Sequence, residues 1–338
     1  MRVYEVVAGS KGVEGLRLAE RPDPEPGRHE VVVRVRATSL NFRDLAVVLG
    51  VYPGPQADAG LIPLSDGAGE VIEVGEGVTR FKKGDRVAST FFQGWVDGPP
   101  RPGFPALGAS TVDGMLAEKV CLHEDGLIAL PDWMTLEEGA TLSCAAVTAW
   151  HGLMVSGRPV KPGDSVLVMG TGGVSMFALQ FARAAGARVI VTSSSDDKLA
   201  RAKGHGASGL INYKQTPDWE KEVLKLTDGR GVDVVVEVGG AGTLAKSYQA
   251  VGFGGRVALI GVLAGHAGDT HPHPLMFKGA SLHGIFVGSR AMFAEMLTAM
   301  TVNQIRPIVD RAFPFEMAAD AYKYQMAGAH FGKVVIAV

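Results

Sequence analysis

Two glycines in a short turn between an apolar segment and a helical segment are the clearest chemical signal in this chain. The apolar segment predicts a buried strand, and Gly170 allows a tight turn at its end. Gly172 has no Cβ, so backbone N–H groups here can approach a pyrophosphate closely. A helix that opens at Gly173 and Val174 would point its N-terminal dipole at the same charge. The spacing therefore predicts a dinucleotide-binding turn, in which Ser175 replaces the third glycine of GxGxxG and is small enough to keep the helix near the sheet.

The residues after the next predicted strand, Arg188–Thr192, indicate which nucleotide is bound. NAD enzymes carry an acidic residue at the end of this strand, where it binds the ribose hydroxyls, and here the position is Ser193. Without that carboxylate a 2′-phosphate is not repelled, and Ser193, Ser194 and Lys198 supply donors and positive charge. The acidic residues 196–197 and the lack of an adjacent arginine count against this, and a solvated lysine is the alternative for Lys198. We predict NADPH as the cofactor, with NADH as the alternative.

Alternating strand and helix segments surround the glycine turn. The expected strands are apolar on both faces, which is typical of parallel βαβ winding, and they are Ser165–Met169, Arg188–Thr192, Val232–Val238, Arg256–Gly261 and Ser281–Val287. Open α/β sheets bind ligands at the carboxyl ends of their strands. We therefore expect the nicotinamide end of the cofactor near Thr148, Val238, Gly239, Gly261, Val262, Phe286 and Val287. A plain turn is the alternative for 238–240.

The first part of the chain is rich in short strands and turns, which suggests a compact antiparallel barrel. Extended segments are expected at Met1–Ala8, Glu30–Ala37, Gly69–Gly75 and Arg86–Ala88, and a long surface loop at Phe91–Thr111. Phe91, Phe92, Trp95 and Phe104 in that loop either line a pocket or pack the loop. A helix is expected from Leu136 to Trp150 and another over about 291–303. The final segment, Gly332–Val338, predicts a strand that returns to the first domain.

Composition limits the classes of function. The 338 residues carry a net charge of −2, with no basic block, so nucleic-acid binding has no electrostatic footprint. No apolar run approaches the roughly 20 residues of a membrane span, and the segment Met1–Ala8 predicts a strand without the long apolar segment expected of a signal peptide. Only Cys121 and Cys144 are present, which favours a reducing compartment and no disulfide framework. We expect a cytoplasmic enzyme with a small-molecule substrate and neither a nucleic-acid nor a membrane partner.

Several further motifs occur in a fixed order: Asn41–Asp44, Gly50–Pro53, Asp66–Val71, Lys82–Val87, Thr141–Trp150, Lys161–Val168 and His330–Ile336. On these the chain resembles the medium-chain dehydrogenase/reductase superfamily over essentially its whole length. It looks closest to the zinc-free branch of NADPH quinone oxidoreductases, also called zinc-independent alcohol dehydrogenases. The resemblance implies a Rossmann doubly wound parallel sheet plus a GroES-like β-barrel, with the active site in the cleft between them. It places the barrel domain at residues 1–145 and 288–338 and the dinucleotide-binding domain at 146–287, and it implies a homodimer, for which the apolar segment 281–287 offers a sheet edge.

The resemblance also bears on metal binding. A catalytic zinc site needs three protein ligands with thiolate, imidazole or carboxylate groups. The ligand positions of zinc-dependent relatives fall here on Asn41, on Ser65–Asp66 and on Cys144, and the 91–111 region has none of the four cysteines of a structural zinc lobe. We expect no metal, and Cys144 as a small buried hydrophobic residue.

Without zinc, another group must polarise the substrate. The resemblance makes Asn41 and Tyr52 the candidate catalytic residues, as hydrogen-bond donors to a carbonyl oxygen. Asn41 has the alternative of tying down a loop, and Tyr52 that of packing at a turn. Arg43 is a candidate to hold substrate, whereas a local ion pair is favoured for Asp44, and the family's relay histidine is replaced by Ala46.

Two further residues follow from the resemblance. Tyr213 falls beside the adenosine phosphate. Lys333 either reaches the cofactor phosphates or is a surface lysine.

Together these features predict a zinc-independent NADPH-dependent oxidoreductase that transfers hydride to a quinone, enone or enal. A metal-free alcohol/carbonyl dehydrogenase and a non-catalytic NADPH-binding protein are the alternatives.

Overall fold

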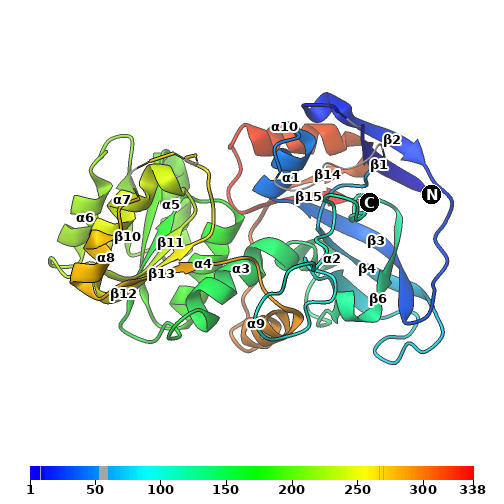
Figure 1. The fold of residues 1–338 in the computed structure, drawn as a ribbon, viewed down its shortest axis with the longest axis horizontal. Helices are drawn as coiled ribbons and strands as arrows, with labels where there is room; N and C mark the ends of the chain where they lie inside the picture. Colours follow the sequence, from blue (N-terminus) through cyan, green and yellow to red (C-terminus); the bar gives the residue numbers. More distant parts are fainter. Residues whose placement is uncertain (8, 53–59, 266, 269) are drawn as a thin grey trace. The chain divides into compact units, whose positions relative to one another are not determined.

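The computed structural model describes residues 1–7, 9–52, 60–265, 267–268 and 270–338, so Pro53 of the Gly50–Pro53 motif lies outside it. The described residues divide into two compact units (Figure 1). The split unit comprises Met1–Val147 and Gly288–Val338, and the inserted unit comprises Thr148–Val287. The predicted boundaries were 145/146 and 287/288. Within the described chain no helix is long and apolar enough to cross a membrane.

The inserted unit contains, among its described residues, a six-stranded sheet whose strands all pair in parallel. Its strands are β8 (Ser165–Met169), β9 (Arg188–Ser193), β10 (Gly209–Asn212), β11 (Val232–Glu237), β12 (Val251–Leu259) and β13 (Ser281–Gly284). Their order is β10-β9-β8-β11-β12-β13, which is the strand order 3-2-1-4-5-6 of the Rossmann fold. The parallel winding was predicted, and the fold class is confirmed.

Helices connect the strands of the inserted unit. They are α4 (Gly173–Ala184), α5 (Asp196–Gly204), α6 (Trp219–Leu226), α7 (Ala241–Ala250) and α8 (His273–Lys278). A buried cluster that includes Leu167, Ile190, Val235 and Val257 packs α6, α7 and α8 against the sheet. After β9 and β10 the chain crosses to the other side of β8, so the strand order reverses between β8 and β11. The glycine turn follows β8 at this reversal, where open α/β sheets bind nucleotides.

Three strand predictions in the inserted unit need correction. β10 was not predicted, because four residues of mixed polarity give too short a pattern. β12 spans Val251–Leu259 rather than Arg256–Gly261. β13 ends at Gly284 rather than Val287, and Val287 itself has a φ of +49°, outside the extended region of a strand.

The split unit is built on an antiparallel sheet in which, among the described residues, seven strands take part. They are β3 (Glu30–Leu40), β4 (Asp66–Val74), β5 (Arg86–Ser89), β6 (Lys119–His123), β7 (Leu127–Ala129), β14 (Val309–Pro314) and β15 (Lys333–Ala337). The order is β14-β15-β3-β4-β5-β7, with β6 on β3, and β1 (Arg2–Val6) pairs separately with β2 (Leu16–Glu20). β15 pairs antiparallel with β3, so the final strand returns to the first domain as predicted, and among the described strands of this sheet its pairing with β14 is the parallel one.

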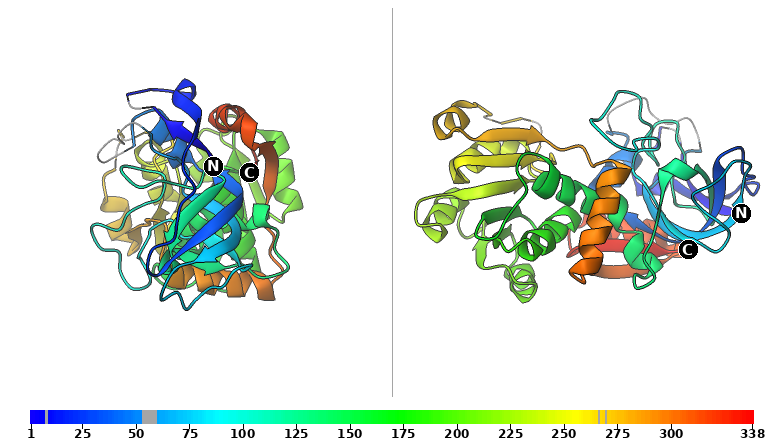
Figure 2. Two further views of the ribbon diagram at one scale, coloured as in Figure 1. Left: turned by 90° about the vertical axis from the view of Figure 1, so that its right-hand side faces the viewer. Right: turned by 90° about the horizontal axis from the view of Figure 1, so that it is seen from below.

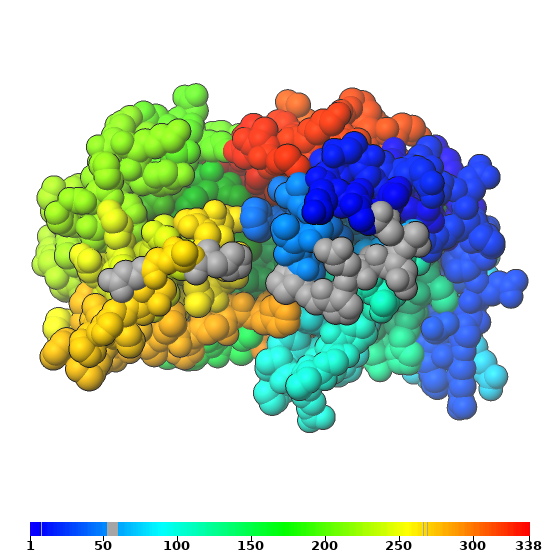
Figure 3. Space-filling model, turned by 45° about the horizontal axis from the view of Figure 1, so that its top comes forward, coloured from blue at the N-terminus to red at the C-terminus, as the bar shows by residue number. Residues whose placement is uncertain are grey.

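The helices of the split unit pack against its strands. They are α1 (Phe42–Val48), α2 (Leu136–Gly139), α9 (Arg290–Val302) and α10 (Ala318–Met326), while α3 (Val147–Trp150) straddles the unit boundary. Figure 2 shows both chain termini in this unit, and in Figure 3 the C-terminal residues (red) lie against the N-terminal ones (blue). The hydroxyl of Tyr4 donates to the Glu316 carbonyl, and the Tyr4 and Phe315 rings meet edge-on at 5.1 Å.

Two predictions in the split unit were incomplete. The helix expected over 136–150 is interrupted, with wide turns over residues 142–146 between α2 and α3. The 91–111 segment is not simply a surface loop, since Phe91, Phe92 and Trp95 are at most 5% exposed. Their rings pack in succession, with centroids 4.7 Å and 5.7 Å apart, and Phe104 stacks on Trp95. Packing of the loop is thus the alternative that these contacts favour.

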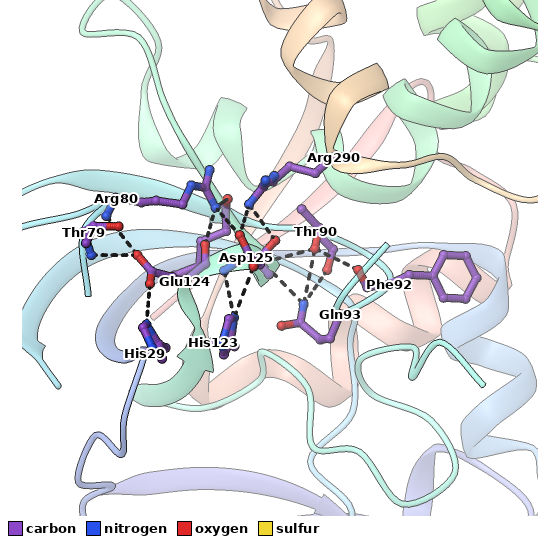
Figure 4. A network of polar contacts seen from close by, with 12 residues as sticks. His29, Thr79, Arg80, Thr90, Phe92, Gln93, His123, Glu124, Asp125 and Arg290 are labelled. Atoms are coloured by element: carbon purple, nitrogen blue, oxygen red, sulfur yellow. Dashed lines mark hydrogen bonds and ion pairs between the residues drawn. The ribbon is translucent and has the colours of Figure 1, made fainter. Parts of the chain in front are cut away.

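A polar network around Glu124 and Asp125 connects several loops of the split unit (Figure 4). The Glu124 carboxylate accepts the backbone N–H groups of Thr79 and Arg80, each at 2.9 Å, and pairs with His29 Nδ1 at 3.0 Å. Burial alone would raise the pKa of Glu124, but these bonds lower it to about 2. Arg290, at the start of α9, donates to Asp125 in the same network.

Candidate active site

The glycine turn has the predicted local geometry. Gly170 has φ of +74°, a left-handed conformation that favours glycine, and Gly172 is the N-cap of α4, which begins at Gly173 and Val174. Ser175 is buried, and its hydroxyl donates to the Met169 carbonyl at 2.7 Å. The serine therefore does more than fit in place of glycine, because it ties the first turn of α4 to the end of β8.

The predicted adenosine-binding residues gather at the end of β9. Ser193 is its last residue, is 3% exposed, and accepts the Ser195 N–H at 3.3 Å. The Tyr213 N–H donates to the Ser193 carbonyl at 3.1 Å, which brings the exposed Tyr213 ring to the same strand end. Ser194 and Lys198 are half-buried, and the Lys198 N–H donates to the Ser195 hydroxyl that caps α5.

Asp196, one of the two acidic residues that counted against NADPH, is hydrogen-bonded to other side chains of the protein. The Asp196 carboxylate accepts the side-chain amides of Asn212 at 2.7 Å and Gln215 at 2.8 Å. The two amides anchor Asp196 to the last residue of β10 and to the turn that follows it. This arrangement reduces the weight of Asp196 as an obstacle to a 2′-phosphate.

The residues predicted at the nicotinamide end follow the carboxyl ends of β11, β12 and β13. Val238 and Gly239 follow β11, and the Leu263 N–H donates to the Val238 carbonyl at 3.1 Å. Gly261 and Val262 follow β12, and Val262 is exposed. The plain-turn alternative for 238–240 has a structural basis in hydrogen bonds from this turn to Glu237.

A buried carboxylate that sequence reasoning missed shapes the turn after β11. Glu237 is fully buried and accepts the N–H groups of Gly239 at 2.7 Å and Gly240 at 3.1 Å, together with the Thr243 hydroxyl at 2.7 Å. A charged residue at the end of an apolar strand was the available signal. These hydrogen bonds to Glu237 stabilise the turn within the protein, whether or not a cofactor is bound.

The segment after β13 is strained at Val287. Phe286 is exposed, whereas Val287 is buried with a φ of +49° that a β-branched residue rarely adopts. The Val287 carbonyl accepts from His151 Nδ1 at 2.8 Å, and burial lowers the pKa of this histidine. Thr148, also predicted, is 3% exposed and begins the inserted unit.

A buried lysine joins the predicted catalytic residue Asn41 in the split unit. Lys333 is 2% exposed, and its ammonium donates to the Leu40 carbonyl at 2.7 Å and to Asn41 Oδ1 at 2.6 Å. The Asp66 carboxylate lies 3.5 Å from the same ammonium. The surface-lysine alternative for Lys333 was therefore wrong. Its acceptors also argue against the phosphate role, because the ammonium is already surrounded by three oxygens within its own unit.

The lysine fixes the orientation of the Asn41 amide. An ammonium group only donates, so the amide atom facing Lys333 is the oxygen and the other is the NH₂ group. Asn41 Nδ2 is buried and has no hydrogen-bond partner among the described residues. A buried donor without an acceptor is costly, and this one is available to a ligand carbonyl.

The residues at the relatives' zinc positions do not fit a zinc ion. Asp66 and Cys144 are the only thiol or carboxylate groups of the set, one short of a catalytic site. Asp66 already accepts from the Ser65 hydroxyl at 2.8 Å and pairs with Lys333, while burial, reinforced by Asp66, raises the pKa of the Cys144 thiol. Over the described residues no three His, Cys, Asp or Glu side chains are grouped to hold a metal.

Arg43 and Tyr52 lie together beside α1. The Arg43 guanidinium stands 4.6 Å from the Tyr52 ring centroid and 4.9 Å from that of Phe91. The Asp44 carboxylate is fully buried, accepts the Asn41 N–H at 2.7 Å, and lies 3.6 Å from Arg43, as expected for a local ion pair. Burial, with a smaller effect of Asp66, raises the pKa of Asp44 to about 6 although Arg43 opposes it.

Comparison with known proteins agrees with this architecture. The family model described as an alcohol dehydrogenase GroES-like domain matches residues 27–132, and that described as a zinc-binding dehydrogenase matches residues 173–301. A zinc-type alcohol dehydrogenase-like protein of Schizosaccharomyces pombe is 45% identical over 347 aligned residues, covering 99% of each chain. A quinone oxidoreductase of Pseudomonas aeruginosa is 34% identical over 336 residues, covering 96% of each. A crystal structure of an NAD-dependent alcohol dehydrogenase matches with a TM-score of 0.92 and 36% identity over 100% of both chains. The chain thus belongs to the medium-chain dehydrogenase/reductase superfamily of pyridine-nucleotide-dependent oxidoreductases.

Proposed function

We propose that the protein is a zinc-independent, NADPH-dependent oxidoreductase that transfers hydride to a conjugated electrophile such as a quinone, enone or enal. The observation that carries the proposal is that the Lys333 ammonium contacts Asn41 and Asp66, two residues at the positions where zinc-dependent relatives carry zinc ligands. A conjugated acceptor needs less polarisation than a simple carbonyl, and hydrogen-bond donors suffice for it.

We assign cofactor binding to groups of the inserted unit and polarisation of the substrate to a group of the split unit. Bound NADPH supplies the hydride. In the inserted unit, the N–H groups at the start of α4 bind the pyrophosphate, and Ser193 leaves room for the 2′-phosphate. In the split unit, Asn41 Nδ2 donates to the substrate carbonyl oxygen as negative charge develops there. The proton that completes reduction comes from solvent or from the Tyr52 hydroxyl.

The finer claims are tested by NADPH oxidation with purified, chelator-treated protein against quinones, enones and simple aldehydes. Turnover of quinones or enones, unaffected by chelator, is the expected result. Turnover of simple aldehydes alone would favour a metal-free alcohol/carbonyl dehydrogenase, and tight NADPH binding without turnover would favour a non-catalytic binding protein. The same assay with NADH measures the cofactor preference, since the similar crystal structure named above is NAD-dependent.

A variant tests the role of Asn41. Asn41→Asp keeps an oxygen acceptor for Lys333 but replaces the Nδ2 donor, so we expect a kcat loss of about 10²-fold, typical of one such donor. Asn303→Asp is the matched control, because that amide only donates to the Ala299 carbonyl at the exposed end of α9. Equal kcat values for Asn41→Asp and the control would rule out Asn41 as the donor.

We also propose a homodimer formed through β13, an edge strand of the inserted unit. Exposed apolar side chains near this edge support it, with Phe253 82%, Phe277 74% and Met276 65% exposed. Light scattering of the wild-type protein should give a dimer mass, and Leu282→Lys should shift it towards the monomer. A monomeric wild-type protein at micromolar concentration would contradict this assembly.

A further inference from the structure

Arg43 has two buried donors that its own protein leaves without an acceptor. Its side chain is 9% exposed, and among the described residues neither Nε nor Nη2 has a hydrogen-bond partner. Within the described residues Nη1 donates to the Leu107 carbonyl at 2.6 Å and lies 3.6 Å from the Asp44 carboxylate. Buried polar groups are almost always satisfied, and unsatisfied charged donors are the costliest exceptions. Two on one side chain therefore indicate a ligand that supplies the acceptors.

The two donors have the geometry of a carboxylate-binding edge. In a guanidinium group the Nε and Nη2 hydrogens on one side point in the same direction, at a spacing that matches the two oxygens of a carboxylate. The Leu107 carbonyl engages the group from Nη1, and the rings of Tyr52 and Phe91 hold its plane. The free edge is thus fixed in place before any ligand arrives, which lowers the entropic cost of binding.

The surrounding charges are compatible with one added anion. Asp44 is the nearest carboxylate, but it contacts Nη1 and not the free edge, and its Oδ1 atom makes no hydrogen bond within the described residues. Asp66 is paired with Lys333 instead. Arg43 is two residues from Asn41, whose Nδ2 donor is also unpartnered. Three donors from one short stretch therefore await acceptors.

We propose that Arg43 binds a carboxylate of the substrate, so that the preferred substrates are conjugated carbonyl compounds that carry a carboxylate group. The carbonyl part of this statement rests on the proposed function, whereas the carboxylate part rests on Arg43 alone. Arg43 is thereby a specificity-determining residue.

The test uses the full-length chain and two pairs of ligands. Benzoylpropanoate and its primary amide lack the conjugated double bond and report binding by calorimetry; benzoylacrylate and its amide report NADPH oxidation. We expect wild-type protein to bind the carboxylate at least about tenfold more tightly than the amide, as charge-assisted bidentate bonds require. Arg43→Met should bring this ratio close to one. Arg43→Lys keeps the charge but loses the paired donors, so its affinity ratio should lie between those of the wild type and Arg43→Met. It replaces Arg43→Met in the test if that variant does not fold.

Arg86→Met is the matched control. Arg86 is an arginine of the same unit whose donors go to the carbonyls of Pro131, Asp132 and Met134, so its loss should leave the ratio unchanged. A ratio near one in the wild type, or a ratio preserved in both Arg43 variants, overturns the inference. An Arg43-dependent ratio with no oxidation of NADPH by either acrylate would uphold the carboxylate site and refute the proposed reductase activity.

Discussion

Replacement of Lys333 by Met separates a structural role beside Asn41 from a role at the cofactor phosphates. The substitution keeps the apolar stem and removes the ammonium, which leaves the Asp66 carboxylate buried without its cation. Breaking a buried ion pair from one side costs roughly 3–5 kcal/mol. Asp66 keeps its bonds from the Ser65 hydroxyl at 2.8 Å and the Cys144 N–H at 3.4 Å, so we expect the low end, about 3 kcal/mol.

Calorimetry should show this loss as a lower melting temperature of the split unit, by about 6–12 °C for a domain of this size. The double variant Lys333→Met/Asp66→Asn removes both charges, and we expect it to recover most of the loss. In the single variant kcat should fall about tenfold, because the Asn41 amide loses the donor that orients it. The NADPH dissociation constant should change less than about twofold.

The control is Lys278→Met in the inserted unit, where the ammonium likewise meets three oxygens, the backbone carbonyls of Tyr248, Gln249 and Val251. It should lower stability without a change in kcat. The reasoning is refuted if Lys333→Met melts and turns over like the wild type. A tenfold weaker NADPH affinity with an unchanged melting temperature would instead restore the phosphate role for Lys333.

Tyr52→Phe keeps the ring that stacks on Arg43, so we expect kcat within about threefold of wild type; a drop of about 10²-fold would make the Tyr52 hydroxyl the proton donor. Ser193→Asp places a carboxylate where a 2′-phosphate is expected, and the ratio of kcat/KM for NADPH over NADH should fall at least about tenfold; an unchanged ratio means that the phosphate pocket lies elsewhere. Glu124→Gln should destabilise the protein by roughly 3 kcal/mol at pH 7, because the folded-state pKa of Glu124 is lowered to about 2 from the ordinary 4.5. That stabilisation is complete above pH 4.5 and disappears as the pH falls towards 2, so urea unfolding at pH 3 should show a smaller difference, and an equal difference at both pH values would contradict it.

Local patterns carried the prediction of the inserted unit. The glycine turn, the apolar strands and the serine at the end of β9 can each be predicted from a few consecutive residues, because strand burial and tight turns depend on neighbouring residues. Local patterns did not predict β10, which is only four residues long. They also placed Val287 in a strand, where tertiary contacts override the extended preference of valine.

The candidate site in the split unit was less predictable. Asn41 was identified from family resemblance, but the lysine that orients it lies 292 residues later in the chain. No spacing rule connects two such positions, and an isolated lysine near a C-terminus is usually solvated. The unpartnered donors of Arg43 were equally hidden, because the number of acceptors around a side chain is a property of the packed structure.

The place of β15 has a consequence for protein synthesis. Domains generally fold as units while the chain emerges from the ribosome, and the inserted unit is contiguous, so its sheet is complete once residue 287 has emerged. The barrel sheet must wait, because β15 lies between β14 and β3 and is made from residues 333–337. Until then β3 exposes an unpaired edge along Ala37–Leu40, next to Asn41. A nascent chain that stops short of Lys333 would therefore hold a finished nucleotide fold beside an open, aggregation-prone barrel.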